Sequence, residues 1–347
     1  MIRQLVGRKL IEVRKNPAGE DVYKIHRLLQ RKIIINIGME LKFDSAMRKA
    51  TRLVRKQFPG ASPIQAPLPK QWPTCQKLMP HVHSLWKAYK DAEVDYESFE
   101  KTEELARLFY DAGFYVWDRP GAEYDGLGFL DKSEAILDSL KVEENHRLRA
   151  DIHCMSGLLR NPMGCEQRDE SLRRLRLARD IRAYQFELNP TRDNDVLLQN
   201  ANTDLGILLL NSYEFREAEE LFEGCLVQYR KWDPVEDNIP FEYSKYYYNA
   251  GIVRMWQKRL NEALDFLQRS VSLAERAFGK EGQFWDNLFM LACVTAQTGD
   301  LDRSLELHRE VLDAKNSQFG RHSRTTILST YAVGSLYAAL NQPDEAW

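Results

Sequence analysis

The sequence has few of the features that membrane, secreted and metal-binding proteins need. No apolar run of about 18 residues occurs, which excludes a membrane-spanning helix of ordinary length. The start Met1–Val6 lacks the apolar core of a secretory signal, so we expect a cytoplasmic protein. Only five cysteines are present among 347 residues, without zinc-site or redox spacing. We therefore expect reduced, mostly buried thiols and no metal site.

A phosphate-binding loop is also missing. The pattern Gly-x-x-x-x-Gly-Lys-Ser/Thr, whose backbone N–H groups cradle phosphates, occurs nowhere in the chain. His146 and His153 lie two turns apart on a predicted helix with Asp151 nearby, but scattered single residues do not define a catalytic group. We expect no cofactor, no catalytic residue and no enzymatic activity.

What the sequence does contain is a repeat built on pairs of small residues. The two members of each pair lie 12 positions apart, and successive pairs recur with a period near 42: Gly206/Ala218, Gly251/Ala263, Ala292/Ser304 and Gly334/Ala346. Two antiparallel helices pack closely only where something small lies at their crossing point. The pattern therefore predicts an all-α fold of stacked helix pairs, which presents a concave surface to a partner.

The ends of the predicted helices add a second periodic signal. Gly299 is suited to a left-handed helix end and Asp300 to capping the next helix, while Ala277–Gly279 and Gln318–Gly320 end successive second helices. Together with Gly320–Thr326, which is similar to a Gly-x-x-His-x-x-Thr linker, these marks resemble tetratricopeptide repeats of the kinesin-light-chain type. The resemblance implies a right-handed α-solenoid that binds proteins or peptides.

Upstream, the helical pattern continues with weaker spacing. Predicted helix pairs span Glu103–Trp117 with Asp131–Leu140, and Glu144–Leu159 with Asp169–Ala183. We expect about five and a half repeats over residues 91–347 and interpret the C-terminus as truncated relative to similar proteins. The last helix would then leave six apolar side chains partly uncovered: Ile327, Leu328, Val333, Leu336, Tyr337 and Leu340.

Residues 1–57 differ in charge from the rest. They hold 15 Lys and Arg against 5 Asp and Glu, whereas the whole chain has a net charge of −2. Strands Leu10–Arg14 and Val22–Ile25, followed by helices His26–Ile37 and Asp44–Gln57, indicate a small winged-helix-like segment with one β-hairpin. A Pro-rich connector and a helix follow over residues 58–90. Winged helices often bind nucleic acid, but a solvated or intramolecular basic face is the favoured interpretation.

The junction between these parts carries a more specific resemblance. The runs Ile25–Gln30, Phe58–Pro63 and Trp72–Val82 are similar to the segment that joins the nucleotide-binding module to the repeats in fungal NOD-like receptors. In that family the winged helix follows an NTPase core, and the repeats sense a ligand. The resemblance makes His26 a nucleotide-sensing residue only where an NTPase core is present. Arg27 departs from the related plant form, which has an acidic residue there.

The first helices of the repeats are expected to form the concave binding surface. Alignment on the small residues predicts which side chains project into this groove, and Asn249 resembles the groove asparagine that holds a peptide backbone in similar repeats. The candidate groove residues are Asp204, Lys245, Tyr248, Asn249, Ile252, Asp286, Phe289, Tyr331 and Ser335. For the neighbouring Tyr243, Tyr246 and Tyr247 we favour packing between repeats.

Three functional hypotheses follow from these patterns. The first is a non-catalytic protein- or peptide-binding module that resembles the ligand-sensing part of a fungal NOD-like receptor. The second is a stand-alone adaptor or scaffold, and the third is an accessory protein or, less expected, an enzyme of a fungal pathway. We expect a protein or peptide partner, no membrane association and no nucleic acid. The ligand and the oligomeric state are not indicated by the sequence.

Overall fold

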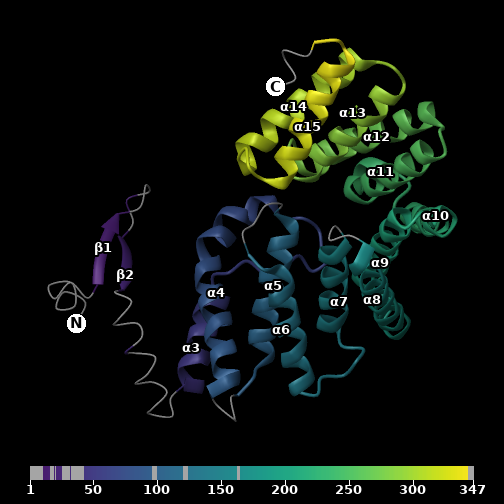
Figure 1. The fold of residues 1–347 in the computed structure, drawn as a ribbon. Coiled ribbons are helices and arrows are strands. Elements are labelled where there is room, and N and C mark those ends of the chain that lie inside the picture. Colours follow the sequence, from purple (N-terminus) through teal and green to yellow (C-terminus); the bar gives the residue numbers. More distant parts are fainter. Residues whose placement is uncertain are drawn as a thin grey trace. The chain divides into compact units, whose positions relative to one another are not determined.

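The structure, a computed structural model, describes residues 11–15, 19, 21–25, 32, 43–95, 100–119, 124–161 and 165–342 (Figure 1). The chain divides into two compact units, one of residues 1–57 and 83–100 and the other of residues 58–82 and 101–347. We call the second the repeat unit. No helix in the described ranges is both long enough and apolar enough to cross a membrane.

The first unit contains the predicted hairpin. Strands β1 (Ile11–Lys15) and β2 (Asp21–Ile25) pair antiparallel, with Ile11 opposite Ile25. Helix α3 (Phe43–Arg55) follows, close to its predicted bounds. The hairpin prediction is confirmed, whereas His26 and most of the helix predicted after it lie outside the described residues.

Helix α4 (Trp72–Asp95) extends past residue 90, the end of the region predicted to hold the connector and this helix; its residues 72–82 belong to the repeat unit and its residues 83–95 to the first unit. The other helices of the repeat unit pack against one another in sequence order (Figure 1). They are α5 (Glu103–Asp118), α6 (Gly126–Ser139), α7 (Arg147–Arg160), α8 (Arg168–Leu188), α9 (Arg192–Asn211), α10 (Phe215–Trp232), α11 (Pro240–Trp256), α12 (Leu260–Phe278), α13 (Gln283–Gln297), α14 (Leu301–Phe319) and α15 (Arg324–Ala339). The chain is thus mostly helical, with stacked helix pairs of the tetratricopeptide type.

Small residues do meet where paired helices cross. The Ser304 hydroxyl of α14 donates to the Ala292 carbonyl of α13 at 2.8 Å, and both residues are fully buried. The same bond joins Ser171 of α8 to the Gly157 carbonyl of α7 at 2.7 Å. A larger side chain at either position would separate the two helix backbones. The predicted role is confirmed for Ala292 and Ser304, whereas Ala346 of the last predicted pair lies outside the described residues.

The predicted helix ends are also confirmed. Gly299 has φ of 94°, and the Asp300 side chain accepts the Arg303 N–H at the start of α14. Gly279 and Gly320 follow α12 and α14 with φ of 71° and 76°. Positive φ is readily adopted by glycine, and here it turns the chain at regular intervals.

Several predicted helix boundaries were wrong: α7 begins at Arg147 and not at Glu144, and α8 ends at Leu188 and not at Ala183. The second helix of the first pair, predicted to begin at Asp131, begins at Gly126. Asp125 explains the difference, because its carboxylate accepts the Gly128 N–H at 2.8 Å and caps the helix earlier than the apolar pattern indicated.

The expectation for the last helix was partly wrong. Val333, Leu336 and Tyr337 of α15 are buried and pack with side chains of α14. Only the opposite face, with Ile327 and Leu328, is exposed. Helix α14 therefore covers the half of the apolar stripe of α15 that contains Val333, Leu336 and Tyr337.

Candidate functional site

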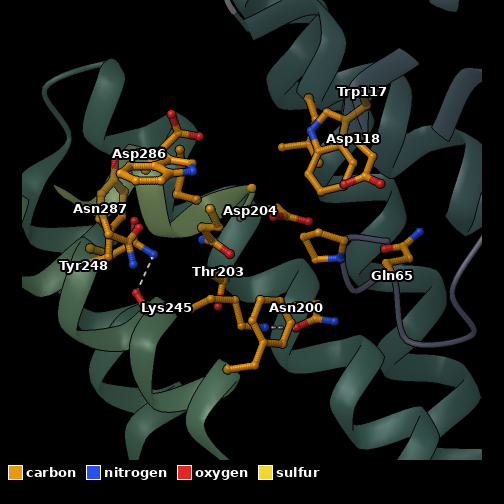
Figure 2. A pocket seen from close by; sticks show the side chains of 18 of the residues that line it. Gln65, Trp117, Asp118, Asn200, Thr203, Asp204, Lys245, Tyr248, Asp286 and Asn287 are labelled. Carbon is orange, nitrogen blue, oxygen red and sulfur yellow. Dashed lines mark hydrogen bonds between the residues drawn. The ribbon is translucent and has the colours of Figure 1, made fainter. Parts of the chain in front are cut away.

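A cavity of about 320 Å³ lies within the repeat unit (Figure 2). The first helices of successive pairs supply much of its wall, from the C-terminal ends of α5 and α7 through α9, α11 and α13. Residues of α14, the start of α15 and the segment 58–71, which we call the connector, complete it. The inner surface of the array is therefore hollowed where the connector meets the C-terminal repeats.

The connector itself is held by side chains of the first helices. The Ala61 N–H donates to the Asp111 carboxylate of α5 at 2.9 Å, and Asn200 of α9 donates to the Ile64 carbonyl at 2.6 Å. These contacts satisfy backbone groups of an irregular segment that would otherwise be buried without partners. The inner face thus already holds one length of irregular chain, supplied by the protein itself.

Gln65 anchors the connector most firmly. Its buried side-chain carbonyl accepts a bond of 2.6 Å from Arg182 of α8, and its NH₂ group donates to the Tyr110 hydroxyl at 3.2 Å. Arg182 also pairs with Asp151 of α7 at 3.4 Å. Asp151, beside the two histidines of the sequence pattern, therefore belongs to a buried structural network and does not line the cavity.

The predicted groove residues fall into two groups. Those that line the cavity are Asp204, Lys245, Tyr248, Asn249 and Asp286. Those that do not are Ile252, Phe289, Tyr331 and Ser335. The second group lies further along the helices or on α15. Tyr331 is largely exposed, and the ring centroids of Phe289 and His308 lie 4.8 Å apart.

Asn249 is buried with one unused hydrogen-bonding atom. Its side chain is 2% exposed, and its NH₂ group donates to the Lys245 carbonyl one turn earlier at 2.9 Å. The side-chain oxygen has no partner. Leaving a buried acceptor unsatisfied costs about 1–3 kcal/mol, so a ligand that donates an N–H here would gain from it.

Two partly buried carboxylates line the cavity, Asp118 on one side and Asp204 near its centre (Figure 2). Asp118 at the end of α5 accepts the Leu68 N–H at 2.9 Å and the Trp72 indole N–H at 2.8 Å. Asp204 of α9 accepts a weak bond from the Cys154 thiol at 3.1 Å. Burial raises the pKa of both carboxyl groups above the ordinary value.

The lysines of the cavity are already engaged. Lys245 is buried and donates to the Asn200 side chain, and burial lowers the pKa of its ammonium group. Lys315 of α14 pairs with the exposed Asp286 at 2.8 Å. Neither lysine forms an ion pair with Asp118 or Asp204 in the part of the chain that the structure describes.

Several aromatic and polar residues that line the cavity were not predicted from the sequence, and we call the aromatic ones the aromatic wall. The aromatic residues are Trp72, Trp117, Phe241, Trp285 and Phe319, and the polar ones are Gln65, Asp118, Asn200, Asn287 and Lys315. Trp72 and Phe319, 247 positions apart in the sequence, lie with ring centroids 5.9 Å apart. The prolines of the connector and Trp72 directly after it were the available signal, but their position on the inner face was not predictable from spacing.

The two histidines of the sequence pattern, His146 and His153, have structural surroundings. The described residues contain no group of three metal-ligating side chains. His146 caps α7 by accepting the Leu148 N–H at 3.3 Å, and His153 is buried beside Glu134 and Arg174. Burial lowers the pKa of His153 to about 4, so its ring is neutral at physiological pH.

Comparison with known proteins agrees with the repeat architecture. A family model described as a tetratricopeptide repeat matches residues 246–283, which span α12 and parts of α11 and α13. NprR in complex with its cognate peptide NprX is similar with a TM-score of 0.55 and 12% identity, over 79% of this chain and 72% of that chain. At these identities the likeness concerns the fold alone.

Two further solved structures are similar. Apo NprR from B. thuringiensis has a TM-score of 0.50 and 11% identity, over 92% of this chain and 91% of that one. The repeats of a putative kinesin light chain from Podospora anserina have a TM-score of 0.43 and 16% identity, over 59% of this chain and 92% of that chain. Comparison with curated protein sequences found no match.

Proposed function

We propose that this protein binds a peptide, or an irregular segment of a partner protein, in the cavity of the repeat unit, without catalysis. The observation that carries the proposal is the unpartnered, buried oxygen of Asn249 on the wall of a cavity formed by the first helices. The connector supports it, because side chains of the same helices already bind the backbone of an irregular segment. NprR, whose fold is similar, has been solved in complex with a peptide.

The size of the cavity favours a short stretch of chain. About 320 Å³ is near the lower end of ordinary ligand pockets, which have roughly 300–1,000 Å³. It accommodates one or two side chains and the backbone between them, and it excludes a folded domain.

Selection from short random peptides displayed on phage tests the proposal. We expect wild-type protein to enrich peptides whose affinity falls about tenfold or more in Asn249→Ala, because the variant lacks the acceptor for a peptide N–H. Tyr248→Ala, on the same wall, should weaken binding as well. The matched control is Asn316→Ala on the exposed face of α14. If no peptide is enriched, or if Asn249→Ala and Tyr248→Ala bind as tightly as the control, the proposal is wrong.

We further propose that the array is the ligand-sensing part of a protein similar to fungal NOD-like receptors. The β1–β2 hairpin and α3, with the runs Phe58–Pro63 and Trp72–Val82, support this assignment. Sequencing the transcript through the locus tests it. An in-frame phosphate-binding loop upstream is expected, and in that case His26 would be the residue to substitute. A transcript without that loop would instead favour the adaptor alternative.

A further inference from the structure

We propose that the cavity binds a basic side chain, arginine or lysine, and that Asp118 and Asp204 hold its cationic group. The inference rests on the peptide-binding function proposed above and specifies the chemistry of the ligand. Figure 2 shows Asp118 on one side of the cavity and Asp204 near its centre.

Both carboxylates lack a counter-charge in direct contact. The partners of Asp118 are the neutral N–H groups of Leu68 and Trp72, and the partner of Asp204 is the thiol of Cys154. Neither forms an ion pair with any residue that the structure describes, in contrast to Asp286, which pairs with Lys315 at 2.8 Å. A cationic ligand would supply the missing ion pair.

The absence of an ion-pair partner among the described residues is energetically important because both carboxylates are partly buried. A carboxylate withdrawn from water is destabilised unless an opposite charge and hydrogen bonds compensate it. Burial raises the pKa of both Asp118 and Asp204; the charges of Arg182 and Lys245 act in the opposite direction on Asp204, although neither forms an ion pair with it. Ion pairs in such surroundings are screened less than ion pairs at the surface.

Unused acceptor atoms on the wall point to the same ligand. The side-chain oxygens of Asn249 and Asn287 have no partner, although these residues are 2% and 0% exposed. An arginine side chain has five N–H donors and no acceptor, whereas a carboxylate or phosphate ligand brings only acceptors.

The aromatic wall suits a flat cation. Trp72, Trp117 and Phe319 line the cavity, and a guanidinium group stacks favourably on such rings. The cavity already contains one contact of this kind, since the Lys245 ammonium lies 4.4 Å from the centroid of the Phe241 ring. The same wall therefore accepts a basic side chain and its apolar stem.

Peptides from the phage selection, resynthesised in two versions, test the inference. One version keeps each arginine and the other replaces it with citrulline, which has the same shape without the charge. We expect the citrulline version to bind the wild type about 30-fold or more weakly, as for a partly buried ion pair. Asp204→Asn keeps the size of the side chain and an acceptor for Cys154. Because Asp118 keeps its charge, this variant should bind the arginine version more weakly and prefer it to the citrulline version by a smaller factor than the wild type does.

Two further variants separate this role from general effects of charge. Asp204→Glu keeps the carboxylate and should retain the preference for arginine, whereas Asp118→Asn should reduce it. Asp265→Asn removes the same charge from an exposed site on α12 and should change nothing. Circular dichroism of each variant establishes that it is folded.

The outcomes distinguish this inference from the proposed function. Enriched peptides without arginine or lysine, or equal binding of the arginine and citrulline versions to the wild type, would overturn the inference and leave peptide binding intact. Failure to enrich any peptide would overturn both.

Discussion

His308 is a buried histidine whose environment opposes its protonation. Its ring packs against Phe289 with centroids 4.8 Å apart, its Nε2 lies 3.8 Å from the Cys293 sulfur, and its Nδ1 has no partner. Burial, followed by the nearby positive charge of Lys315, lowers the pKa of His308 to about 4. The folded protein therefore holds this ring neutral, whereas the unfolded chain protonates it near pH 6.5.

The sign of the pH dependence follows from this difference. Between about pH 6.5 and pH 4 the unfolded state binds more protons, so the contribution of His308 to stability is complete above that range and is lost as the pH falls. We predict that His308→Leu reduces the loss of unfolding free energy between about pH 7 and pH 4.5 by on the order of 1–2 kcal/mol. Urea unfolding at the two pH values measures it.

Exposed His322 provides the control for this measurement. His322→Gln should keep the pH dependence of the wild type. The wild-type loss also contains the contribution of His153, whose pKa is lowered in the same direction, so His308→Leu should remove only part of it. An unchanged loss in His308→Leu would show that the buried ring is not neutral in the folded protein.

Among the helices, packing depends on glycines at the crossings. A Cβ atom on Gly206 of α9 would lie 2.5 Å from the Phe222 ring of α10, whereas a Cβ on Gly224 of α10 would meet nothing within 4 Å. Both glycines lie inside helices, so alanine offers each the same gain in helix propensity. The difference between the two sites is therefore contact with the neighbouring helix.

We predict opposite effects for the two substitutions. Gly206→Ala should destabilise the protein by about 1–2 kcal/mol, because overpacking exceeds the gain in propensity. Gly224→Ala should stabilise it by about 0.5–1 kcal/mol. Chemical denaturation of the two variants beside the wild type measures this. Stabilisation by both substitutions would show that α9 and α10 are not held at this separation.

At the scale of the whole molecule, the connector ties distant repeats together. Gln65 bonds Arg182, which lies 117 positions later, and Asn200 bonds the Ile64 carbonyl over 136 positions. These contacts bring α8 and α9 together with a segment that precedes the array. The connector is therefore part of the repeat unit and not a flexible link.

Removal of the Gln65 side chain should destabilise the protein and loosen the connector from the helices. Gln65→Ala removes the shortest of the hydrogen bonds of the buried Arg182 and the donor to the Tyr110 hydroxyl, and we predict a loss of about 1–3 kcal/mol in unfolding free energy. Cleavage within residues 58–71 by a protease should also accelerate. Gln71→Ala, at an exposed position of the same segment, should leave both unchanged. A stable Gln65→Ala protein with an uncut connector would contradict this role.

Local features of the repeats could be predicted, because each depends on residues near one another in sequence. The pairing of Ala292 with Ser304 follows from a spacing that positions one residue on each of two consecutive helices. The left-handed conformation of Gly299 follows from the residue type. Tyr213 and Lys258 adopt the same conformation after α9 and α11, with φ of 65° and 62°, and there the residue type did not reveal it.

The groove could be predicted only in part, because a cavity depends on how far helices stack and what fills the space between them. Spacing indicated a face of α11 that includes Lys245, Tyr248 and Asn249. It did not indicate that Asp118 would reach this cavity. Spacing also extended the groove to Tyr331, which the cavity does not reach.

The sequence by itself determined the periodic architecture, since small residues, capping residues and apolar stripes act within one or two helices. Only the tertiary structure decided where the connector lies and which charges remain without a partner. Those features depend on contacts such as Trp72 with Phe319, whose positions are set by the accumulated packing of every helix between them. No local sequence pattern predicts this packing, which forms the cavity and leaves Asp118 and Asp204 in it without an ion-pair partner among the described residues.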